Sequence, residues 1–169
     1  MKQDLIKIYT VRTPVGLQNI ASLISQEIAF ERGLLPESII GYFVKEINIE
    51  ELNPNDFIRN SLFVKFLHHS IAEFAPFIKS FQASAQKLIN GWVYVIDKRT
   101  PDPCGNVPPE DIIGAFEIRK GAVIEGSYKP NDNHRILSQK GFFRLDVELY
   151  EHLMNKLKKL YELSDRQNN

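Results

Sequence analysis

A glycine-containing turn between two apolar runs constrains the fold of this chain more than any other feature. Residues 111–119 and 122–128 are rich in β-branched and aromatic side chains, and they flank Lys120-Gly121. Two such runs, separated by so short a connection with a glycine, predict a β-hairpin. The chain therefore builds on a sheet with at least one antiparallel strand pair.

The register of this hairpin can be predicted from its apolar residues. A three-residue loop pairs apolar residues or glycine along one face: Ile118 with Ala122, Phe116 with Ile124, Gly114 with Gly126 and Ile112 with Tyr128. A two-residue loop instead pairs Phe116 with Glu125 and turns part of the apolar set toward water. We therefore predict the three-residue loop, with Glu117 and Arg119 on the opposite face.

The rest of the chain alternates between strand and helix signals. Further strands are predicted where runs are apolar or alternate in polarity, at residues 5–12, 39–47 and 92–96. Helices are predicted where apolar residues recur every three or four positions, at residues 17–28, 57–88 and 149–161. Pro76 should kink the second helical region or divide it into two helices. We expect an α+β fold, with an antiparallel or mixed sheet of about five strands, including hairpin 111–128, covered by amphipathic helices.

Length and composition are those of one globular domain. The chain has 169 residues, 43% of them hydrophobic and 25% charged, which is close to the globular average. We expect a single domain over residues 1–163 and a disordered polar tail at 164–169. Lys plus Arg equals Asp plus Glu, at 21 each, so we expect no nucleic-acid partner.

The number of cysteines and the lengths of the apolar runs indicate the cellular compartment. Cys104 is the only cysteine, which excludes an internal disulfide and a cysteine-rich metal site. No run has the length of a signal peptide core or a membrane span. The four histidines lack a metal-binding spacing. We expect a cytoplasmic protein with no metal, no cofactor and no membrane association.

An acidic pair gives one catalytic hypothesis. Pro101-Asp102 precedes Glu117-Ile118-Arg119, which resembles, in degenerate form, the motif of the PD-(D/E)xK nuclease superfamily. The resemblance implies that Asp102, or Asp97 in its place, holds a divalent metal together with Glu117, and that Arg119 stands where the family has a lysine. Arginine is a poor proton-transfer group, so the match departs from the family there. The implied activity is that of a metal-dependent phosphodiesterase or nuclease.

A second polar cluster indicates binding. It comprises Lys98, Arg99, Asn133, His134 and Arg135. These side chains can bind the carboxylate or phosphate of a small anionic ligand if the hairpin returns beside the 92–96 strand. The other interpretation of residues 131–135 is an Asx-rich turn whose side chains bond their own backbone.

The last helix suggests a protein partner. Leucines at 149, 153, 157 and 160 form a narrow apolar seam, which could pair with a second copy as a homodimer or pack on the chain's own sheet. Since no complete catalytic motif is visible, the sequence favours a non-enzymatic ligand-binding or protein-interaction module. The metal-dependent phosphodiesterase is the alternative.

Overall fold

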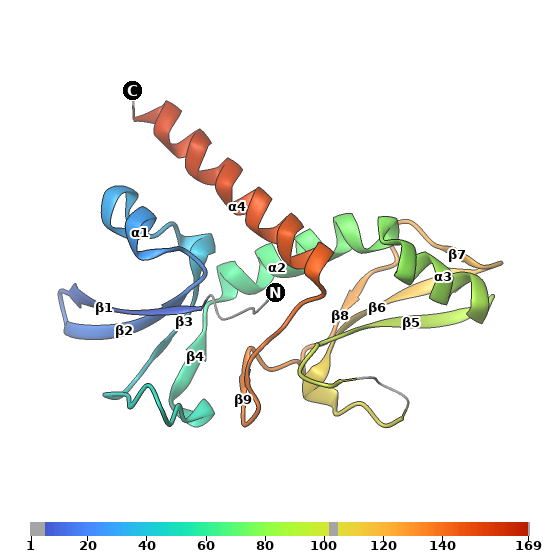
Figure 1. Ribbon diagram of the computed structural model, residues 1–169, viewed down its shortest axis with the longest axis horizontal. Helices are drawn as coiled ribbons and strands as arrows, with labels where there is room; N and C mark the ends of the chain where they lie inside the picture. The colour runs from blue at the N-terminus through green and yellow to red at the C-terminus, as the bar shows by residue number, and fades with distance from the viewer. Residues whose placement is uncertain (1–5, 102–104, 169) are drawn as a thin grey trace. The chain divides into compact units, whose positions relative to one another are not determined.

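The computed structural model describes residues 6–101 and 105–168 (Figure 1). The chain divides into two compact units: unit 1 is Met1–Phe66, Ile136–Phe142 and Asn155–Asn169, and unit 2 is Leu67–Arg135 and Phe143–Met154. The predicted α+β class is confirmed. Within the described residues, the strands form two four-stranded sheets and one two-stranded sheet, all antiparallel, rather than one sheet of about five. The single domain over residues 1–163 stays a prediction.

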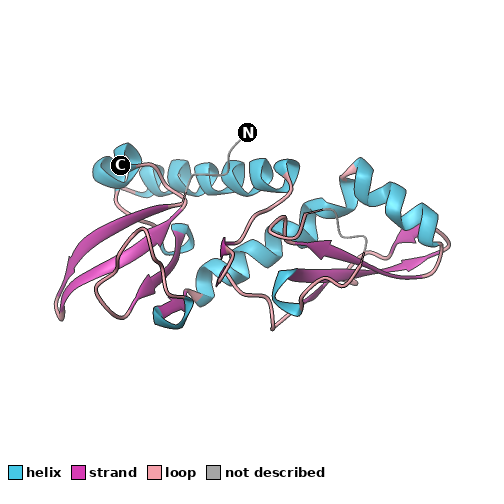
Figure 2. Ribbon diagram, turned by 60° about the horizontal axis from the view of Figure 1, so that its bottom comes forward, coloured by secondary structure: helices cyan, strands magenta, loops and turns pink. Residues whose placement is uncertain are grey.

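Unit 1 is built on a meander of four strands, drawn in magenta in Figure 2. The strands are β1 (Lys7–Thr13), β2 (Gly16–Ser22), β3 (Ile39–Phe43) and β4 (Phe57–Arg59). The short elements of this unit are α1 (Gln26–Arg32), the 3-10 turns η1 (Pro36–Ser38) and η2 (Pro54–Asp56), and the strand pair β9 (Leu137–Ser138) and β10 (Gly141–Phe142).

The prediction of a helix over residues 17–28 is wrong, because residues 17–22 belong to β2. Gly16 has φ 125° at the end of a two-residue loop, and this loop folds β2 back on β1. As an inner strand, β2 buries Ile20, Ala21 and Ser22 in succession. Burial on both faces of a strand places apolar residues at spacings that also fit a helix.

Unit 2 holds the predicted hairpin. Its elements are α3 (Lys79–Leu88), β5 (Gly91–Ile96), η4 (Pro109–Asp111), β6 (Ile112–Arg119), β7 (Ala122–Val123) and β8 (Lys129–Pro130). β6 pairs with β5 on one side and with β7 and β8 on the other. Phe116 and Ile118 of β6 are buried, whereas Arg119 is exposed and Glu117 is half-buried, as the predicted faces require.

The predicted register of the hairpin is wrong by one residue. Arg119 pairs with Ala122 and Ile118 with Val123, so the loop has two residues, Lys120 at φ 51° and Gly121 at φ 76°. Both residues have the positive φ that a type I′ turn requires. The objection to this register was that it pairs Phe116 with Glu125. That pair does not form, because β7 ends at Val123 and the chain turns at residues 124–127.

Tyr128 fills the space that Gly114 leaves on the apolar face of β6. A Cβ atom at Gly114 would lie 2.5 Å from the Tyr128 hydroxyl and 2.6 Å from its ring. Gly114 pairs with Pro130 instead of the predicted Gly126. The Tyr128 hydroxyl lies 2.7 Å from His68 Nδ1, and burial raises the pKa of Tyr128.

Two longer helices complete the chain. α2 (Ser61–Phe74) begins four residues later than predicted, since Phe57 pairs with Phe43 in the sheet. η3 (Ala75–Phe77) contains Pro76 and separates α2 from α3, so the predicted division into two helices is found.

α4 (Val147–Gln167) contains the leucine seam. Leu149, Leu153 and Leu157 are buried, and Leu160 is half-buried. The homodimer stays a prediction. α4 continues to Gln167 and so includes most of the tail 164–169 that was predicted to be disordered. Among the residues described here, no helix combines the length and the apolar character that crossing a bilayer demands.

Candidate functional site

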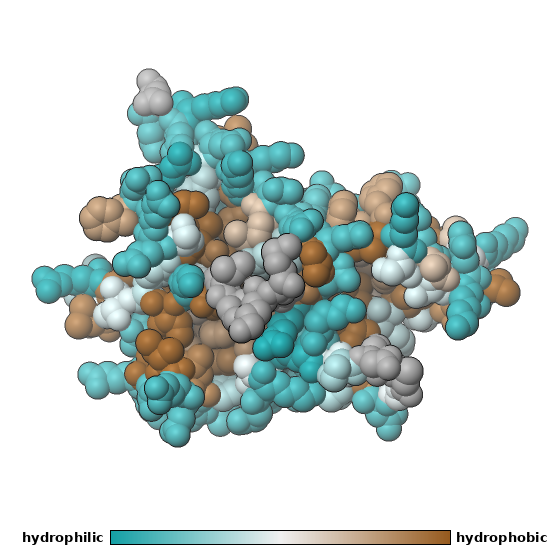
Figure 3. Space-filling view, in the orientation of Figure 1, coloured by the Kyte–Doolittle hydropathy of each residue, from teal (hydrophilic) through white to brown (hydrophobic). Residues whose placement is uncertain are grey.

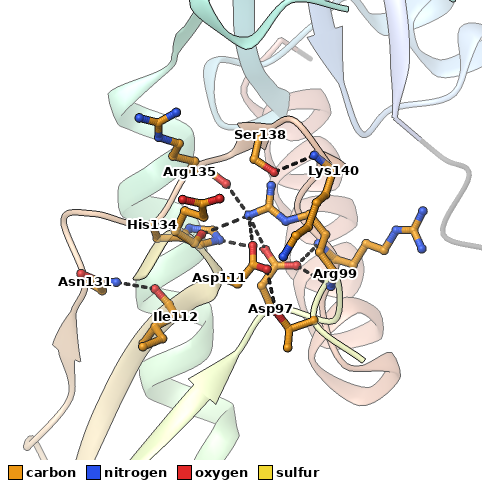
Figure 4. A network of polar contacts seen from close by, with 12 residues as sticks. Asp97, Arg99, Asp111, Ile112, Asn131, His134, Arg135, Ser138 and Lys140 are labelled. Atoms are coloured by element: carbon orange, nitrogen blue, oxygen red, sulfur yellow. Dashed lines mark hydrogen bonds and ion pairs between the residues drawn. The ribbon is translucent and has the colours of Figure 1, made fainter. Parts of the chain in front are cut away.

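Four charged or polar side chains form a buried cluster in unit 2 (Figure 4). Asp97 and Asp111 are 0% exposed, His134 is 3% exposed, and the Arg99 side chain is 1% exposed. We call Asp97, Arg99, Asp111 and His134 the Asp97 cluster. Buried charges need partners, because water no longer solvates them.

The elements around the long loop 98–110 place these residues. Asp97 follows the last residue of β5, and its N–H donates to the Asp111 carbonyl at 2.7 Å. Asp111 ends η4 and precedes β6. The Thr100 hydroxyl donates to Asp111 Oδ2 at 2.6 Å. Both ends of the loop are therefore tied to each other.

Asp97 is the centre of the cluster, because both of its carboxylate oxygens are engaged. Oδ1 accepts from the N–H groups of Arg99 and Arg144, each at 3.0 Å. Oδ2 lies 3.0 Å from Arg99 Nη2 and 2.9 Å from His134 Nε2. One carboxylate thus joins the end of β5, the loop after it and the segments around residues 134 and 144.

Arg99 stands between the two carboxylates. Its Nη2 lies 3.0 Å from Asp97 Oδ2 and 3.2 Å from Asp111 Oδ1, and it donates to the carbonyls of Arg135 at 2.7 Å and Glu110 at 3.1 Å. A guanidinium that bridges two buried carboxylates neutralises part of their charge. The cluster is a buried clamp, because its charged groups are directed at one another and not at solvent.

The five residues of the predicted anion site differ in their exposure. Arg99 and His134 belong to the Asp97 cluster, whereas the side chains of Lys98, Asn133 and Arg135 are exposed. Lys98 lines a pocket of about 220 Å³. The Asn133 N–H donates to Asn131 Oδ1 at 3.1 Å. Residues 131–133 therefore form the Asx turn that was the other interpretation.

Of the residues of the predicted metal site, Asp97 and Glu117 lie at opposite ends of β6. Asp97 lies beside Asp111, and Ile112 to Glu117 covers about 17 Å at roughly 3.3 Å per strand residue. Glu117 forms a surface ion pair with Arg119 at 2.7 Å. Asp102 lies outside the described residues, as does Cys104. Residues 6–101 and 105–168 contain no group of three or more His, Cys, Asp or Glu that could hold a metal ion.

Sequence reasoning did not identify Asp111 and Thr100 as members of the site. Asp111 follows Pro108-Pro109-Glu110 and has the appearance of an ordinary turn residue before a strand. The signal that could have found it is the pairing of β5 with β6, which brings Ile96 opposite Ile112 and hence Asp97 beside Asp111.

Unit 1 contains an apolar groove between β1 and α1. It has a volume of about 430 Å³ and no charged residue in its lining, which consists of Tyr9, Thr10, Val11, Ile20, Gln26, Ala29, Phe30, Gly33, Leu34 and Ile39. Phe30 is 91% exposed at its rim. Figure 3 shows apolar side chains, in brown, at the surface on the side of the molecule that carries β1–β4. An apolar surface of this kind often marks an interaction site.

One wall of this groove is the edge of a sheet. β1 lies at the end of the strand order and pairs with β2 alone. Thr13 and Gly16 close the β1–β2 loop, so this pair exchanges backbone hydrogen bonds, and the bonded pairs then alternate along the strand. Lys7, Tyr9 and Val11 therefore bond to β2. The N–H and C=O groups of Ile8, Thr10 and Arg12 point away from the sheet.

The Tyr9 side chain links β1 to the segment that precedes α1. Its hydroxyl donates to the Ile24 carbonyl at 2.6 Å. Burial, with a smaller contribution from Tyr161, raises the pKa of Tyr9. The sequence offered no sign of this groove, because residues 17–28 were predicted to be a helix.

Comparison with known proteins finds no family model, no curated protein and no solved structure that matches this chain. The function must be inferred from the geometry of the two sites.

Proposed function

We propose that this protein is a non-enzymatic interaction module that binds an extended peptide segment of a partner protein along β1. The observation that carries the proposal is the edge of β1 beside the apolar groove, both within unit 1. In this mode of recognition the peptide adds a strand to the sheet. Its backbone supplies hydrogen bonds, and its alternate side chains supply specificity.

The outward backbone groups of β1 favour an extended strand as the binding partner. Ile8, Thr10 and Arg12 direct N–H and C=O groups outward at every second residue, as derived from the β1–β2 register. An added strand satisfies all of them in one continuous ladder, whereas a compact ligand reaches one or two. Each such bond contributes about 0.5–1.5 kcal/mol net.

The apolar lining of the groove favours apolar side chains on that strand. Side chains of a β-strand alternate between its two faces, so every second residue of the peptide faces Tyr9, Val11 and Phe30. Burying one aliphatic side chain contributes about 1.5–3 kcal/mol. The cost of ordering the peptide offsets much of this gain, so we expect a weak and reversible complex.

The state of the charged groups supports binding over catalysis. The carboxylates of the Asp97 cluster are buried and engaged with Arg99 and His134, so no substrate from solvent reaches them. Glu117 and Arg119 pair with each other at the surface. A general acid or base must lie within hydrogen-bond reach of the substrate, which the buried carboxylates of the Asp97 cluster do not offer.

A proline at position 10 tests strand addition. The Thr10 N–H points away from β2, so proline there removes an outward donor and leaves the β1–β2 ladder in place. Peptides that bind the full-length protein are selected from a phage-displayed library of random decapeptides. We expect Thr10→Pro to abolish their binding and Thr10→Val, which keeps the N–H, to retain it.

The stability of both variants is measured by urea unfolding, so that a loss of binding is not confused with a loss of fold. If the library yields no binder, or if its binders hold to Thr10→Pro as well as to the wild type, β1 is not the site and the proposal fails.

A further inference from the structure

Building on strand addition at β1, we infer that the partner peptide carries an acidic residue at each end of a six-residue stretch with two apolar anchors between them. The sequence pattern is acidic, apolar, any, apolar, any, acidic. The inference rests on the proposed function and adds the chemical class of the peptide. Two cations on β1 and the alternation of its faces determine the pattern.

The edge strand β1 and its neighbour β2 contain two cations and no acidic residue. Lys7 and Arg12 are exposed, and no acidic residue occurs between positions 6 and 26. Neither cation belongs to any ion pair found within the described part of the chain. Because the groove lining is uncharged, the charge that a peptide meets lies at the two ends of β1.

The spacing of these cations sets the spacing of the acids. Residues directly opposite on paired strands share a face, and opposite charges there are stabilising. Lys7 and Arg12 are five residues apart, so the acids opposite them are also five apart. Tyr9 and Val11 face the groove, and the peptide residues opposite them are the two apolar anchors.

The peptide runs antiparallel to β1. Every strand pair in the sheet of unit 1 is antiparallel, and antiparallel pairing is the more stable per residue. From its N-terminus, the peptide then places an acid opposite Arg12, anchors opposite Val11 and Tyr9, and the second acid opposite Lys7. The sequence Glu-Val-Thr-Val-Thr-Glu satisfies this pattern.

A second copy of β1 does not satisfy it. In an antiparallel pair centred on Thr10, Arg12 faces Ile8 of the other copy and Lys7 faces Thr13, so neither cation meets an acid. In a parallel pair in register, Lys7 faces Lys7 and Arg12 faces Arg12, which is repulsive. The charge of the edge therefore favours a foreign acidic strand over self-association.

Two synthetic peptides and one charge-reversed variant test the pattern. The peptides are Glu-Val-Thr-Val-Thr-Glu and Lys-Val-Thr-Val-Thr-Lys. Each has a glycine at both ends, blocked termini and a fluorophore. Fluorescence anisotropy measures their binding to the full-length protein. We expect the acidic peptide to bind at least about tenfold more tightly at low salt. The double variant Lys7→Glu/Arg12→Glu should reverse the preference, and 0.5 M salt should reduce it.

Backbone methylation separates strand pairing from charge attraction. The two threonines lie opposite Thr10 and Ile8, whose hydrogen bonds face the peptide, so N-methylation of both threonines should abolish binding. N-methylation of both valines adds the same number of methyl groups at positions whose N–H groups point away from β1, and binding should remain.

The outcomes distinguish the inference from the function on which it rests. Library binders that are lost with Thr10→Pro but show no acidic pair at a spacing of five leave strand addition standing and overturn the acidic pattern. An acidic peptide that binds equally well to the charge-reversed variant also overturns it. If no peptide binds at β1 at all, both proposals fall together.

Discussion

Replacing Arg99 with methionine is the sharpest test of the role of the Asp97 cluster. Methionine keeps most of the volume of the side chain and removes the guanidinium that lies 3.0 Å from Asp97 and 3.2 Å from Asp111. Both carboxylates are 0% exposed, so they remain buried with less compensation for their charge. Breaking a buried ion pair from one side costs about 3–5 kcal/mol.

That loss is a large part of the stability of the protein. Domains of this class unfold with about 5–15 kcal/mol. At about 2–4 °C per kcal/mol for a chain of this length, Arg99→Met should lower Tm by roughly 6–20 °C. Urea unfolding followed by circular dichroism gives the free energy directly, and a thermal scan gives Tm.

Arg119→Met is the matched control. It removes the same chemical group from an ion pair of similar length, the Glu117 pair at 2.7 Å, but the side chains there are 65% and 31% exposed. Exposed pairs contribute about 0–1 kcal/mol, so this variant should unfold close to the wild type. Equal losses for Arg99→Met and Arg119→Met would refute the assignment of the cluster as a buried clamp.

A second substitution tests the mechanism of the loss. In Arg99→Met the penalty comes from carboxylates left with too little positive charge, so Asp111→Asn in that background removes one of those charges and should recover part of the stability. In the wild-type background, Asp111→Asn should be destabilising. Additive losses in the double variant would show that the charge of Asp111 is not the cause.

Two further predictions concern Tyr128. Gly114→Ala places a methyl group 2.5 Å from the Tyr128 hydroxyl and should lower the free energy of unfolding in urea by about 1–3 kcal/mol. The control is Gly105→Ala, whose methyl group meets nothing within 4 Å and which should change stability by less than about 0.5 kcal/mol. Equal effects of the two substitutions would contradict the close contact at Gly114. Burial raises the pKa of Tyr128 above its ordinary value of 10.0, so above pH 10 the unfolded chain loses this proton while the folded chain keeps it. Stability should therefore be intact below pH 10 and fall as pH rises beyond it. Tyr128→Phe should make this fall less steep when the free energy of unfolding in urea is measured from pH 9 to 11. If stability falls with pH as steeply in the variant as in the wild type, another group is responsible.

The hairpin shows how far local sequence rules extend. The turn at Lys120-Gly121 and the inward direction of Phe116 and Ile118 could be predicted, since both follow from glycine and from alternation. The register of the hairpin could not be predicted from these local rules. It depends on the turn after Val123, where the Ser127 hydroxyl accepts from the Glu117 N–H at 3.0 Å and takes the place of a strand partner.

The two sites differ in how much the sequence revealed. Asp97, Arg99 and His134 were each identified as candidate polar residues. Whether they lie in one cluster depends on which strands pair and on the turn at Asn131. The groove was hidden because β2 buries Ile20, Ala21 and Ser22 in succession, and such a run also fits a helix. Periodicity alone does not separate a strand buried on both faces from a helix.

The two cations of β1 have a structural and a functional interpretation, and these are compatible. Charged residues on an edge strand disfavour its pairing with other copies, and we expect this of Lys7 and Arg12 because self-pairing brings neither of them to an acid. The same charges leave the edge open to a strand that carries acids at the matching spacing. An edge with two cations and with outward hydrogen-bonding groups at Ile8, Thr10 and Arg12 suits the acidic class of peptide that we propose. Under the proposed function, the two cations that disfavour self-pairing of β1 are therefore also the residues that select the peptide.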